Sequence, residues 1–442
     1  MVVRPTVALQ VFSYDVRDEG AEPCLAAARL AGAEVVLLCV SHWDAILPAL
    51  PGRERRLPHN PTRSSHGSGA YFRPVGTYPA ALRPSDEPGD LADGDTAWSE
   101  LAPPAHDTGI SVIPWVHLLT DRVALGAPAH AMRNAAGQIV PGWLCPSHAD
   151  VVDFACARVS DVIEKLGPPA IFIDRIRFPD WGLNGFIDSC TCFCDACHDL
   201  AATQGLYLAQ LREPLLSFAE LLRRDPARAS RISHDAVGSA VGTLRTTSDN
   251  DAVLHWLRFR HFLIERLVRK VSEVVRGRCE LWLDVWPPSW AWILGQDLRR
   301  LAPYATWIKP MVYHRRSGGS DIPGFIASLS PDPTIQDAAY QTFRALFAFP
   351  GPANVQDLLI GGLDPLFITQ ELQLANNMLD GRSHLAAGIE VYACGPQGVV
   401  TALDHAATAN PVGYFINNFA VAELDELAAV GEWIQQRANG NT

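Results

Sequence analysis

The sequence predicts an α/β protein of the (β/α)8 TIM-barrel class. Eight apolar runs of strand length recur along the 442 residues, and helical patterns fill most of the gaps between them. The runs span residues 6–14, 33–43, 110–118, 170–178, 279–286, 306–313, 385–392 and 412–419. Such near-continuous apolar strands are typical of a parallel sheet that is covered on both faces. Because eight strand–helix units close a barrel, we prefer this fold to its rival, an open doubly wound sheet.

Amphipathic helices and long connections complete the predicted architecture. Residues 149–166, 251–276 and 422–437 carry helical patterns, and the last of them follows the eighth strand. The stretches 44–105, 188–250 and 314–383 are too long for simple loops. We therefore expect insertions after strands 2, 4 and 6. Residues 1–442 are expected to form a single catalytic barrel without an appended domain.

The composition restricts the partners of the chain. It is 48% hydrophobic and 19% charged, as in ordinary globular proteins, with a formal net charge of −12. No basic run is long enough to follow a phosphate backbone, so we expect no nucleic-acid partner. The N-terminal stretch has no leader-peptide pattern, and no apolar run reaches membrane-spanning length. We expect a cytoplasmic protein with reduced thiols and no membrane partner, for which a homo-oligomer stays open.

Three carboxylates stand where predicted barrel strands end, which is where barrel enzymes place their chemistry. Asp174 lies toward the end of strand four, Asp284 toward the end of strand five and Glu390 toward the end of strand seven. Burying a lone carboxylate costs several kcal/mol unless it is paired. Each also has a structural interpretation. For Asp174 it is an ion pair with Arg175 or Arg177, for Asp284 a loop-anchoring hydrogen bond, and for Glu390 a helix cap.

Aromatic and polar side chains accompany these carboxylates at the strand ends. Indole faces can stack on sugar rings, and paired carboxylates supply the acid and the nucleophile or base for glycosidic cleavage. Some of the twelve tryptophans must nevertheless pack in the core. The pattern predicts a site for a small carbohydrate. The expected substrate-binding residues are Trp115, His117, Arg175, Arg177, Trp286, Lys309, Tyr313 and Asn417.

The stretch DSCTCFCDACHDLA, residues 188–201, concentrates four cysteines. Cys192, Cys194 and Cys197 have the tight spacing of thiolate ligands for tetrahedral zinc. So short a loop cannot easily pair them all as disulfides, and unligated thiols are the structural alternative. The candidates for a fourth ligand are Cys145, Cys190 and His198. A closed four-sulfur site would be structural and would attach the insertion after strand four to the barrel rim.

Two segments resemble glycoside hydrolase family 42, a family of β-galactosidases. They are WLCPSHADVV at residues 143–152 and CFCDACHDLA at residues 192–201. In that family a Cys-Pro motif before strand four and a Cys-x-Cys-x-x-Cys motif after it hold structural zinc. The resemblance implies that Zn²⁺ is bound here by Cys145, Cys192, Cys194 and Cys197. The strand-four segment IFIDRIRFP also resembles related glycosyl-hydrolase-like barrels.

The resemblance implies roles for the carboxylates as well. Glu390 matches the nucleophile that the clan carries at the end of strand seven, which implies a retaining mechanism. The clan has Asn-Glu at the end of strand four, whereas this chain has Asp174-Arg175. Asp174 is therefore the expected acid/base, and Asp284 is a third carboxylate that can replace either. The C-terminal domains of the family, including its trimerisation domain, are not found in this sequence.

The leading hypothesis is a divergent, retaining glycoside hydrolase that cleaves a small intracellular glycoside or oligosaccharide. Two other functions stay open at this point. A zinc-dependent hydrolase would use metal-activated water, but it needs an open coordination site that all-cysteine spacing does not offer. A non-catalytic sugar-binding barrel is favoured by the missing Asn-Glu pair.

Overall fold

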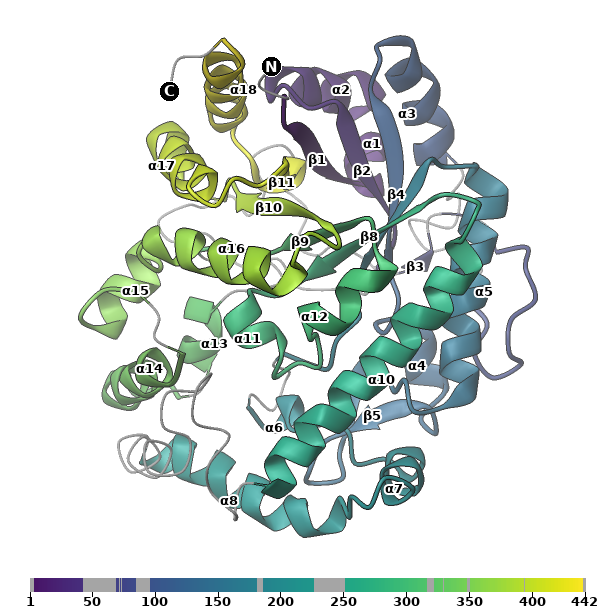
Figure 1. Cartoon of the computed structure of the whole chain (residues 1–442), viewed down its shortest axis with the longest axis vertical. Coiled ribbons are helices and arrows are strands. Elements are labelled where there is room, and N and C mark those ends of the chain that lie inside the picture. Colours follow the sequence, from purple (N-terminus) through teal and green to yellow (C-terminus); the bar gives the residue numbers. More distant parts are fainter. Residues whose placement is uncertain are drawn as a thin grey trace.

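Eight parallel strands form a closed barrel in the computed structural model of the chain (Figure 1). The structure describes residues 4–42, 69–70, 72, 74–84, 96–180, 186–225, 251–315, 322–328, 330–347, 350–392 and 394–439. The barrel strands are β1 (Thr6–Phe12), β2 (Val35–His42), β4 (Ser111–His117), β7 (Ala170–Asp174), β8 (Glu280–Val285), β9 (Trp307–Pro310), β10 (His384–Glu390) and β11 (Gly413–Asn417). The predicted fold is confirmed, because β1 pairs in parallel with both β2 and β11 and so closes the sheet.

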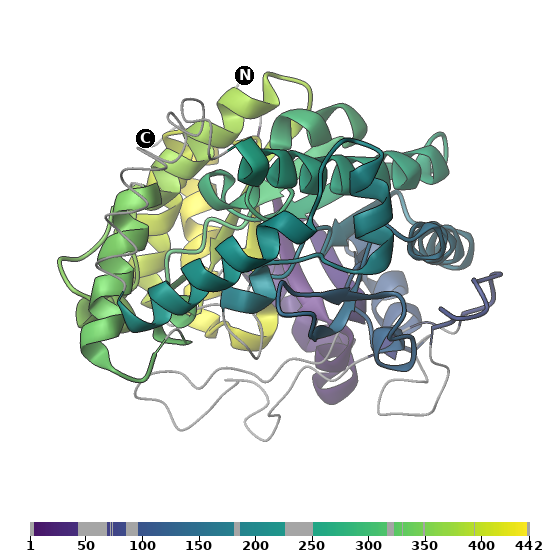
Figure 2. The same ribbon diagram turned by 90° about the horizontal axis from the view of Figure 1, so that it is seen from below.

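Helices surround the strands on the outside of the barrel (Figure 2). The 25-residue helix α10 (Asp251–Val275) packs against α5 (Ala149–Leu166), as the two long amphipathic patterns predict. After the last strand, α18 (Leu424–Ala438) packs on α2 (Ala21–Leu30), where Gly431 lets the two backbones meet at Leu30 O. The ring of helices is thereby closed along with the ring of strands. None of the described helices is long and apolar enough to cross a membrane.

The other described elements complete the chain in order. The α-helices are α1 (Ser13–Glu19), α3 (Thr96–Asp107), α4 (Val123–Gly126), α6 (Phe186–Ser189), α7 (Asp195–Ala202), α8 (Ala209–Arg224), α11 (Pro288–Ala291), α12 (Leu298–Leu301), α13 (Ile322–Ser328), α14 (Pro333–Phe347), α15 (Val355–Gly361), α16 (Leu366–Leu379) and α17 (Gly395–Ala407). Two short 3₁₀ helices are η2 (Ala302–Tyr304) and η4 (Phe419–Val421), and a further short strand is β3 (Gly69–Ala70).

Aromatic side chains fill the inside of the barrel below its carboxyl-terminal mouth. The ring of Phe415 on β11 lies 5.4 Å from Trp282, 5.8 Å from Trp307 and 6.1 Å from Phe172, measured between ring centroids. Gly413, two residues before Phe415, is required here because a Cβ would lie 2.8 Å from the Trp307 ring. Part of the tryptophan content therefore serves the core, as expected, and the chemistry must lie above this layer.

The structure departs from the predicted elements in two places that matter for the site. The run predicted as a strand over 170–178 ends at Asp174, because Arg175 adopts a left-handed φ of 55° that turns the chain. An antiparallel hairpin of β5 (Ala131–Arg133) and β6 (Ile139–Leu144) follows strand three and was not predicted. Its second strand carries Trp143 and leads directly into Cys145.

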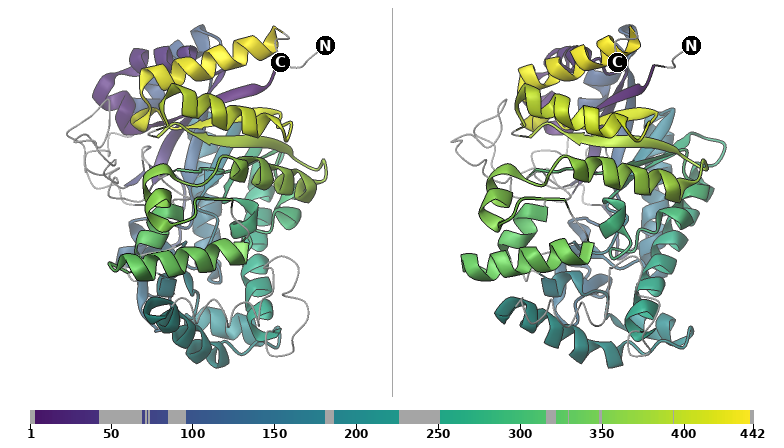
Figure 3. Two further views of the ribbon diagram at one scale, coloured as in Figure 1. Left: turned by 90° about the vertical axis from the view of Figure 1, so that its left-hand side faces the viewer. Right: turned by 60° about the vertical axis from the view of Figure 1, so that its left-hand side comes forward.

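The predicted insertions are described in part. Helices α6, α7 and α8 lie in the insertion after strand four, and α13, α14 and α15 lie in the one after strand six. Figure 3 shows α8 (teal) and α14 (green) on the side of the molecule away from the two termini, and the two helices are in contact. Within the predicted insertions, residues 44–68, 71, 73, 85–95, 226–250, 316–321, 329 and 348–349 lie outside the described residues.

Candidate active site and metal centre

The three predicted carboxylates lie together at the carboxyl-terminal mouth of the barrel. Asp174, Asp284 and Glu390 are 5%, 1% and 1% exposed, at or near the ends of β7, β8 and β10. Tyr313, which follows β9, lies within the electrostatic reach of all three. Burial raises the pKa of Tyr313 well above its ordinary value, and the negative charges of Asp284, Asp174 and Glu390 raise it further. The topology thus brings together residues that are far apart in the chain.

Asp174 is held as an ion by its neighbours. Its Oδ2 lies 3.2 Å from Nε2 of His117, its Oδ1 lies 3.3 Å from Arg177, and the Arg175 backbone N–H donates to Oδ1. Burial raises the pKa of Asp174, but His117, Arg177 and Arg175 outweigh it and hold the pKa well below its ordinary value. Burial also lowers the pKa of His117, against the opposing charge of Asp174. An ionised carboxylate of this kind is a poor proton donor.

Asp284 lies in a different environment, paired with a buried lysine. Nζ of Lys309 is 3.1 Å from both carboxylate oxygens of Asp284, and it donates to Tyr313 Oη at 2.6 Å and to Gln10 at 3.4 Å. Burial raises the pKa of Asp284 to about 7, against the opposing charge of Lys309. Burial likewise lowers the pKa of Lys309. Asp284 is therefore the carboxyl group suited to donate a proton near neutral pH.

A glycine on β10 makes room for this lysine. A Cβ at Gly388 would lie 2.5 Å from Cε of Lys309 and 2.5 Å from the carbonyl oxygen of Pro310. Gly388 and Glu390 are two residues apart on one strand and so share a face of the sheet. The same short segment of β10 therefore admits Lys309 to the barrel centre and supplies the carboxylate above it.

Glu390 has one oxygen held and one oxygen without a partner. Its Oε1 accepts the backbone N–H of Arg315 and lies 3.2 Å from Nδ1 of His314. Its Oε2 has no hydrogen-bond partner among the described residues. The predicted helix-capping role is wrong, because the first N–H of α17, on Gly395, donates to Glu426 at 2.7 Å. A fixed carboxylate with one oxygen to spare is what a nucleophile requires.

The predicted substrate-binding residues surround this group at different depths. Arg175 keeps 25% of its side chain exposed and lies 3.8 Å from Asp180, with its guanidinium 6.0 Å from the ring of Trp143. Asn417 accepts a hydrogen bond from Asn418 at 3.0 Å. The predicted substrate-binding residues that are at most 6% exposed are Trp115, His117, Arg177, Trp286, Lys309, Tyr313 and Asn417. Of the predicted set, Arg175 is the side chain most able to touch a substrate in this conformation.

Sequence reasoning did not assign five residues of this site, namely Gln10, Trp143, His314, Arg315 and Gly388. The backbone N–H of Arg315 donates to Glu390, and Gly388 leaves space for Lys309 because it has no Cβ. Neither property has a sequence signature. Trp143 was missed with its hairpin, although the alternating pattern QIVPGWL after a turn-rich NAAG could have indicated a strand.

Four cysteines form a second, separate centre. The sulfur atoms of Cys145, Cys192, Cys194 and Cys197 all lie within 4.8 Å of one another, and all four residues are buried. Cys145 Sγ is 3.4 Å from Cys197 Sγ and 3.6 Å from Cys194 Sγ. A tetrahedral ion with metal–sulfur bonds of about 2.3 Å needs sulfur atoms roughly 3.8 Å apart, so the donor set fits. The described structure thus adds Cys145, from the end of the hairpin, to the three clustered cysteines.

Backbone donors and neighbouring thiols surround the four sulfur atoms. Backbone N–H groups of Arg133 and Cys194 donate to Cys192 Sγ at 3.4 and 3.5 Å. Hydrogen bonds from the other three thiols hold the pKa of Cys194 well below its ordinary value, whereas burial raises the pKa values of Cys145 and Cys197. Of the other candidate ligands, Cys190 is outside the group and its pKa is raised to about 12 by burial, while His198 packs on Phe193.

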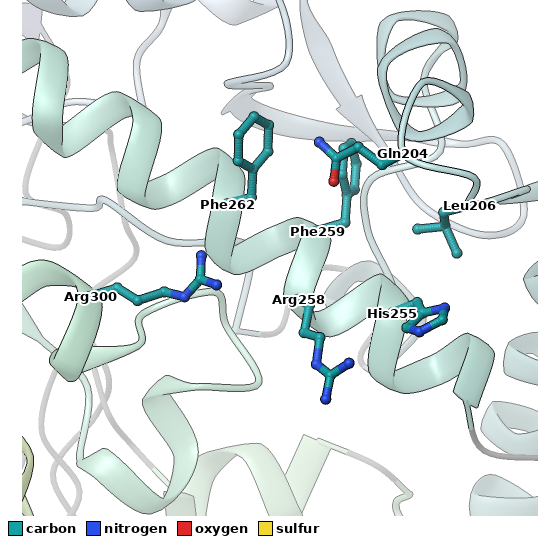
Figure 4. A pocket seen from close by; sticks show the side chains of 7 residues that line it. All are labelled: Gln204, Leu206, His255, Arg258, Phe259, Phe262 and Arg300. Atoms are coloured by element: carbon teal, nitrogen blue, oxygen red, sulfur yellow. The ribbon is translucent and has the colours of Figure 1, made fainter. Parts of the chain in front are cut away.

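A surface hollow of about 300 Å³ lies between α10 and the segment that follows α7 (Figure 4). Its lining includes Arg258, Phe259 and Phe262 of α10 together with Arg300. It contains none of the predicted site residues. Of its charged side chains, Arg258 is exposed on α10, and Arg300 forms an ion pair with Glu265 at 2.8 Å. We assign no function to this hollow.

Comparison with known proteins relates the fold to enzymes that act on carbohydrates. No protein-family model and no curated protein matches the chain. The glycoside hydrolase domain of PgaB (BpsB) from Bordetella bronchiseptica is similar with a TM-score of 0.53 and 11% identity, over 98% of each chain. The catalytic domain of β-amylase from Paenibacillus polymyxa gives 0.54 and 9%, over 99% of this chain and 100% of that one. A β-galactosidase from Marinomonas ef1 gives 0.52 and 9%, over 99% and 61%. At these identities the likeness shows a shared fold.

Proposed function

We propose that the chain is a retaining glycoside hydrolase with Glu390 as nucleophile and Asp284 as proton donor. The observation that carries the proposal is the pairing of two buried carboxyl groups in opposite environments. Glu390 has one oxygen fixed by Arg315 and the other without a partner among the described residues, whereas the pKa of Asp284 is raised to about 7. The glycoside hydrolases among the structures of similar fold support the reaction class, whereas the roles of the two carboxyl groups rest on their environments in this chain.

The proposed reaction has two displacements at the anomeric carbon. Oε2 of Glu390 attacks that carbon while the glycosidic bond breaks, and the Asp284 carboxyl donates its proton to the departing oxygen. Asp284, now ionised, is stabilised by Lys309. A water molecule then attacks the glycosyl–Glu390 ester, gives its proton to Asp284, and releases the sugar with its configuration retained.

This proposal changes the role expected for Asp174. Its ionised state and its contacts with His117 and Arg177 favour a positioning role at the rim of the site. Arg175, beside it in the chain, keeps a partly exposed side chain that can bind a hydroxyl or carboxylate group of a small carbohydrate. The other predicted substrate-binding residues support these groups from below or beside them.

We also propose that the four-cysteine centre holds a structural Zn²⁺. When bound, zinc supplies a crosslink between the end of the β5–β6 hairpin, at Cys145, and the segment that leads into α7. Four cysteine ligands close the coordination shell, so the centre is not proposed to activate water. The reduced thiols that such a centre requires fit the cytoplasmic location expected from the sequence.

A non-catalytic sugar-binding barrel is the second candidate. It is supported by the ionised Asp174 in the place of the clan's acid/base and by the burial of Asp284. Turnover decides between the two candidates, because a binding protein retains a sugar without cleaving it.

The test is a screen of 4-nitrophenyl glycosides with the wild-type protein and the Glu390→Gln variant. We expect one class of glycoside to be hydrolysed with retention. Nuclear magnetic resonance of the first product formed measures its anomeric configuration. Glu390→Gln should reduce turnover by several orders of magnitude and leave sugar binding intact, because the amide keeps the shape and loses the nucleophile. Near-normal turnover by Glu390→Gln, or sugar binding without cleavage by the wild type, would contradict the proposal.

A further inference from the structure

A fully buried arginine next to the cysteine centre lacks any hydrogen-bond partner among the described residues. Arg260 on α10 is 1% exposed, and none of its three guanidinium nitrogens has a partner in that part of the chain. Its guanidinium stacks on Trp256 at 4.7 Å and on Phe178 at 4.4 Å. Stacking on two rings does not by itself compensate a buried charge, which normally requires an opposite charge.

The cysteine segment lies against the same aromatic side chain. The ring of Phe193, between Cys192 and Cys194, lies 6.4 Å from the ring of Trp256. Arg260 and the cysteine motif thus lie on one cluster of rings. The thiols of Cys190, Cys192 and Cys197 are also the groups that act electrostatically on Arg260, opposing the burial that lowers its pKa to about 9.

A second arginine of α10 approaches the centre from the side of Cys145. Arg266 donates to the carbonyl oxygen of Pro146 at 2.7 Å and to that of Ser147 at 3.2 Å. These two residues directly follow Cys145, so Arg266 holds the backbone that presents this ligand. Its charge acts on Cys145 and Cys197.

The charge of the proposed metal centre explains this arrangement. Four thiolates around a divalent ion leave about two negative charges in a buried place. Such a charge needs compensation as much as a buried guanidinium does. Helix α10 carries two guanidinium groups that interact electrostatically with these thiols, Arg260 from the ring cluster and Arg266 from its hydrogen bonds to Pro146 and Ser147.

We propose that Arg260 and Arg266 are the counter-cations of a tetrathiolate metal centre, and that α10 thereby sets its metal affinity. The inference rests on the proposed zinc site and goes beyond it, because it assigns positioning residues outside the cysteine motif. The position of Arg260 also has a second consequence, at the active site. Since Arg260 stacks on Phe178, four residues after Asp174, it links the metal centre to the turn that carries Asp174 and Arg175.

The experiment compares the wild type with Arg260→Met, Arg260→Lys and Arg258→Met as full-length, metal-loaded proteins. Methionine keeps the packing on the rings and removes the charge, whereas lysine keeps the charge. Arg258 is the matched control, since it lies on the exposed side of the same helix and lines the surface hollow (Figure 4). The readouts are zinc content, transfer of zinc to a coloured chelator, and the thiolate-to-metal charge-transfer absorption after exchange to Co²⁺.

We expect Arg260→Met to weaken zinc binding by about 10- to 100-fold, as other outer-shell substitutions do. Its charge-transfer absorption should move to longer wavelength, because the sulfur electrons lose a stabilising positive charge. Arg260→Lys should stay within a few-fold of the wild type, and Arg258→Met should match it.

Three results would overturn the inference. They are wild-type affinity and absorption in Arg260→Met, equal losses in Arg260→Met and Arg260→Lys, or an equal loss in Arg258→Met. If Arg260→Met does not fold, Arg266→Met and Arg266→Lys carry the same comparison at a partly exposed position, and an unchanged Arg266→Met would overturn it. Absence of metal from the freshly purified wild type would instead reject the zinc site, so the two failures are distinguishable.

Discussion

At the scale of single residues, neighbours decide which of the carboxyl groups at the barrel mouth can do which work. Asp174 and Asp284 are both aspartates at the ends of adjacent strands, and both are buried. Asp174 lies between two arginines and His117, whereas Asp284 faces one lysine whose own pKa is lowered by burial. The environments push the pKa values of the two carboxyl groups in opposite directions, which is how one site separates an ion from an acid.

This difference predicts distinct effects of Asp284→Asn and Asp174→Asn. Removing the proton donor should reduce turnover by roughly 10²- to 10⁴-fold on glycosides with poor leaving groups, and far less on activated aryl glycosides. Asp174→Asn should affect both substrate classes about equally, because it removes a positioning charge. Rates measured over a series of leaving groups provide the check. Leaving-group dependence in Asp174→Asn instead of Asp284→Asn would restore Asp174 as the acid.

The pH dependence follows from the same residue. An acid must be protonated to act, and the pKa of Asp284 is raised to about 7, so kcat/KM should fall as pH rises above about 7. Asp284→Asn should remove this alkaline limb. If the pH profile of Asp284→Asn keeps the alkaline limb of the wild type, that limb belongs to another group.

At the scale of elements, β10 needs a residue without a side chain where Lys309 enters the barrel. The side chain of Lys309 reaches Asp284, Tyr313 and Gln10 only because Gly388 has no Cβ in its path. The strand therefore controls the position of the lysine, and through it the pKa of the proposed acid.

We expect Gly388→Ala to displace Lys309 and to destabilise the protein by about 1–3 kcal/mol through overpacking. Because Lys309 lowers the pKa of Asp284, its displacement should move the alkaline limb of kcat/KM to higher pH. Denaturant unfolding and pH profiles measure the two effects. Gly126→Ala in α4 is the control, since a Cβ there meets nothing within 4 Å. A variant with unchanged stability and an unchanged limb would show that β10 does not position Lys309.

At the scale of the whole molecule, barrel closure depends on the aromatic layer beneath the site. Phe415 of β11 contacts rings from β7, β8 and β9, so it connects the last strand to the opposite side of the barrel. The helices repeat this closure outside, where α18 meets α2.

Phe415→Ala should cost about 3–5 kcal/mol in the free energy of unfolding, because it leaves a cavity among rings that cannot collapse. Phe415→Leu should cost less, since it refills part of the volume. Equilibrium denaturation of both variants tests this, and equal stabilities of Phe415→Ala and the wild type would contradict the role of this layer in closing the barrel.

Much of the fold could be predicted because its signals are local. Strand runs such as residues 170–173 are continuously apolar, and the helix predicted over 149–166 is observed over the same residues. The hairpin of β5 and β6 was missed because its strands are short and its pairing depends on contacts outside the local pattern. The strand predicted to continue to 178 was cut short because Arg175 turns the chain at φ 55°.

The sequence by itself determined the barrel class, the three carboxylates at strand ends and the clustered cysteines, since periodicity and spacing are properties of the chain alone. Only the tertiary structure decided the rest. It brought the sulfur atom of Cys145, which the family resemblance had implied as a ligand, within 4.8 Å of those of Cys192, Cys194 and Cys197, and it placed Arg260 in the buried surroundings of the same centre. It also surrounded Asp174 with positive charge and buried Asp284 against Lys309. The physical reason is that pKa values and metal affinity depend on distances and burial between segments far apart in sequence, which no local pattern records.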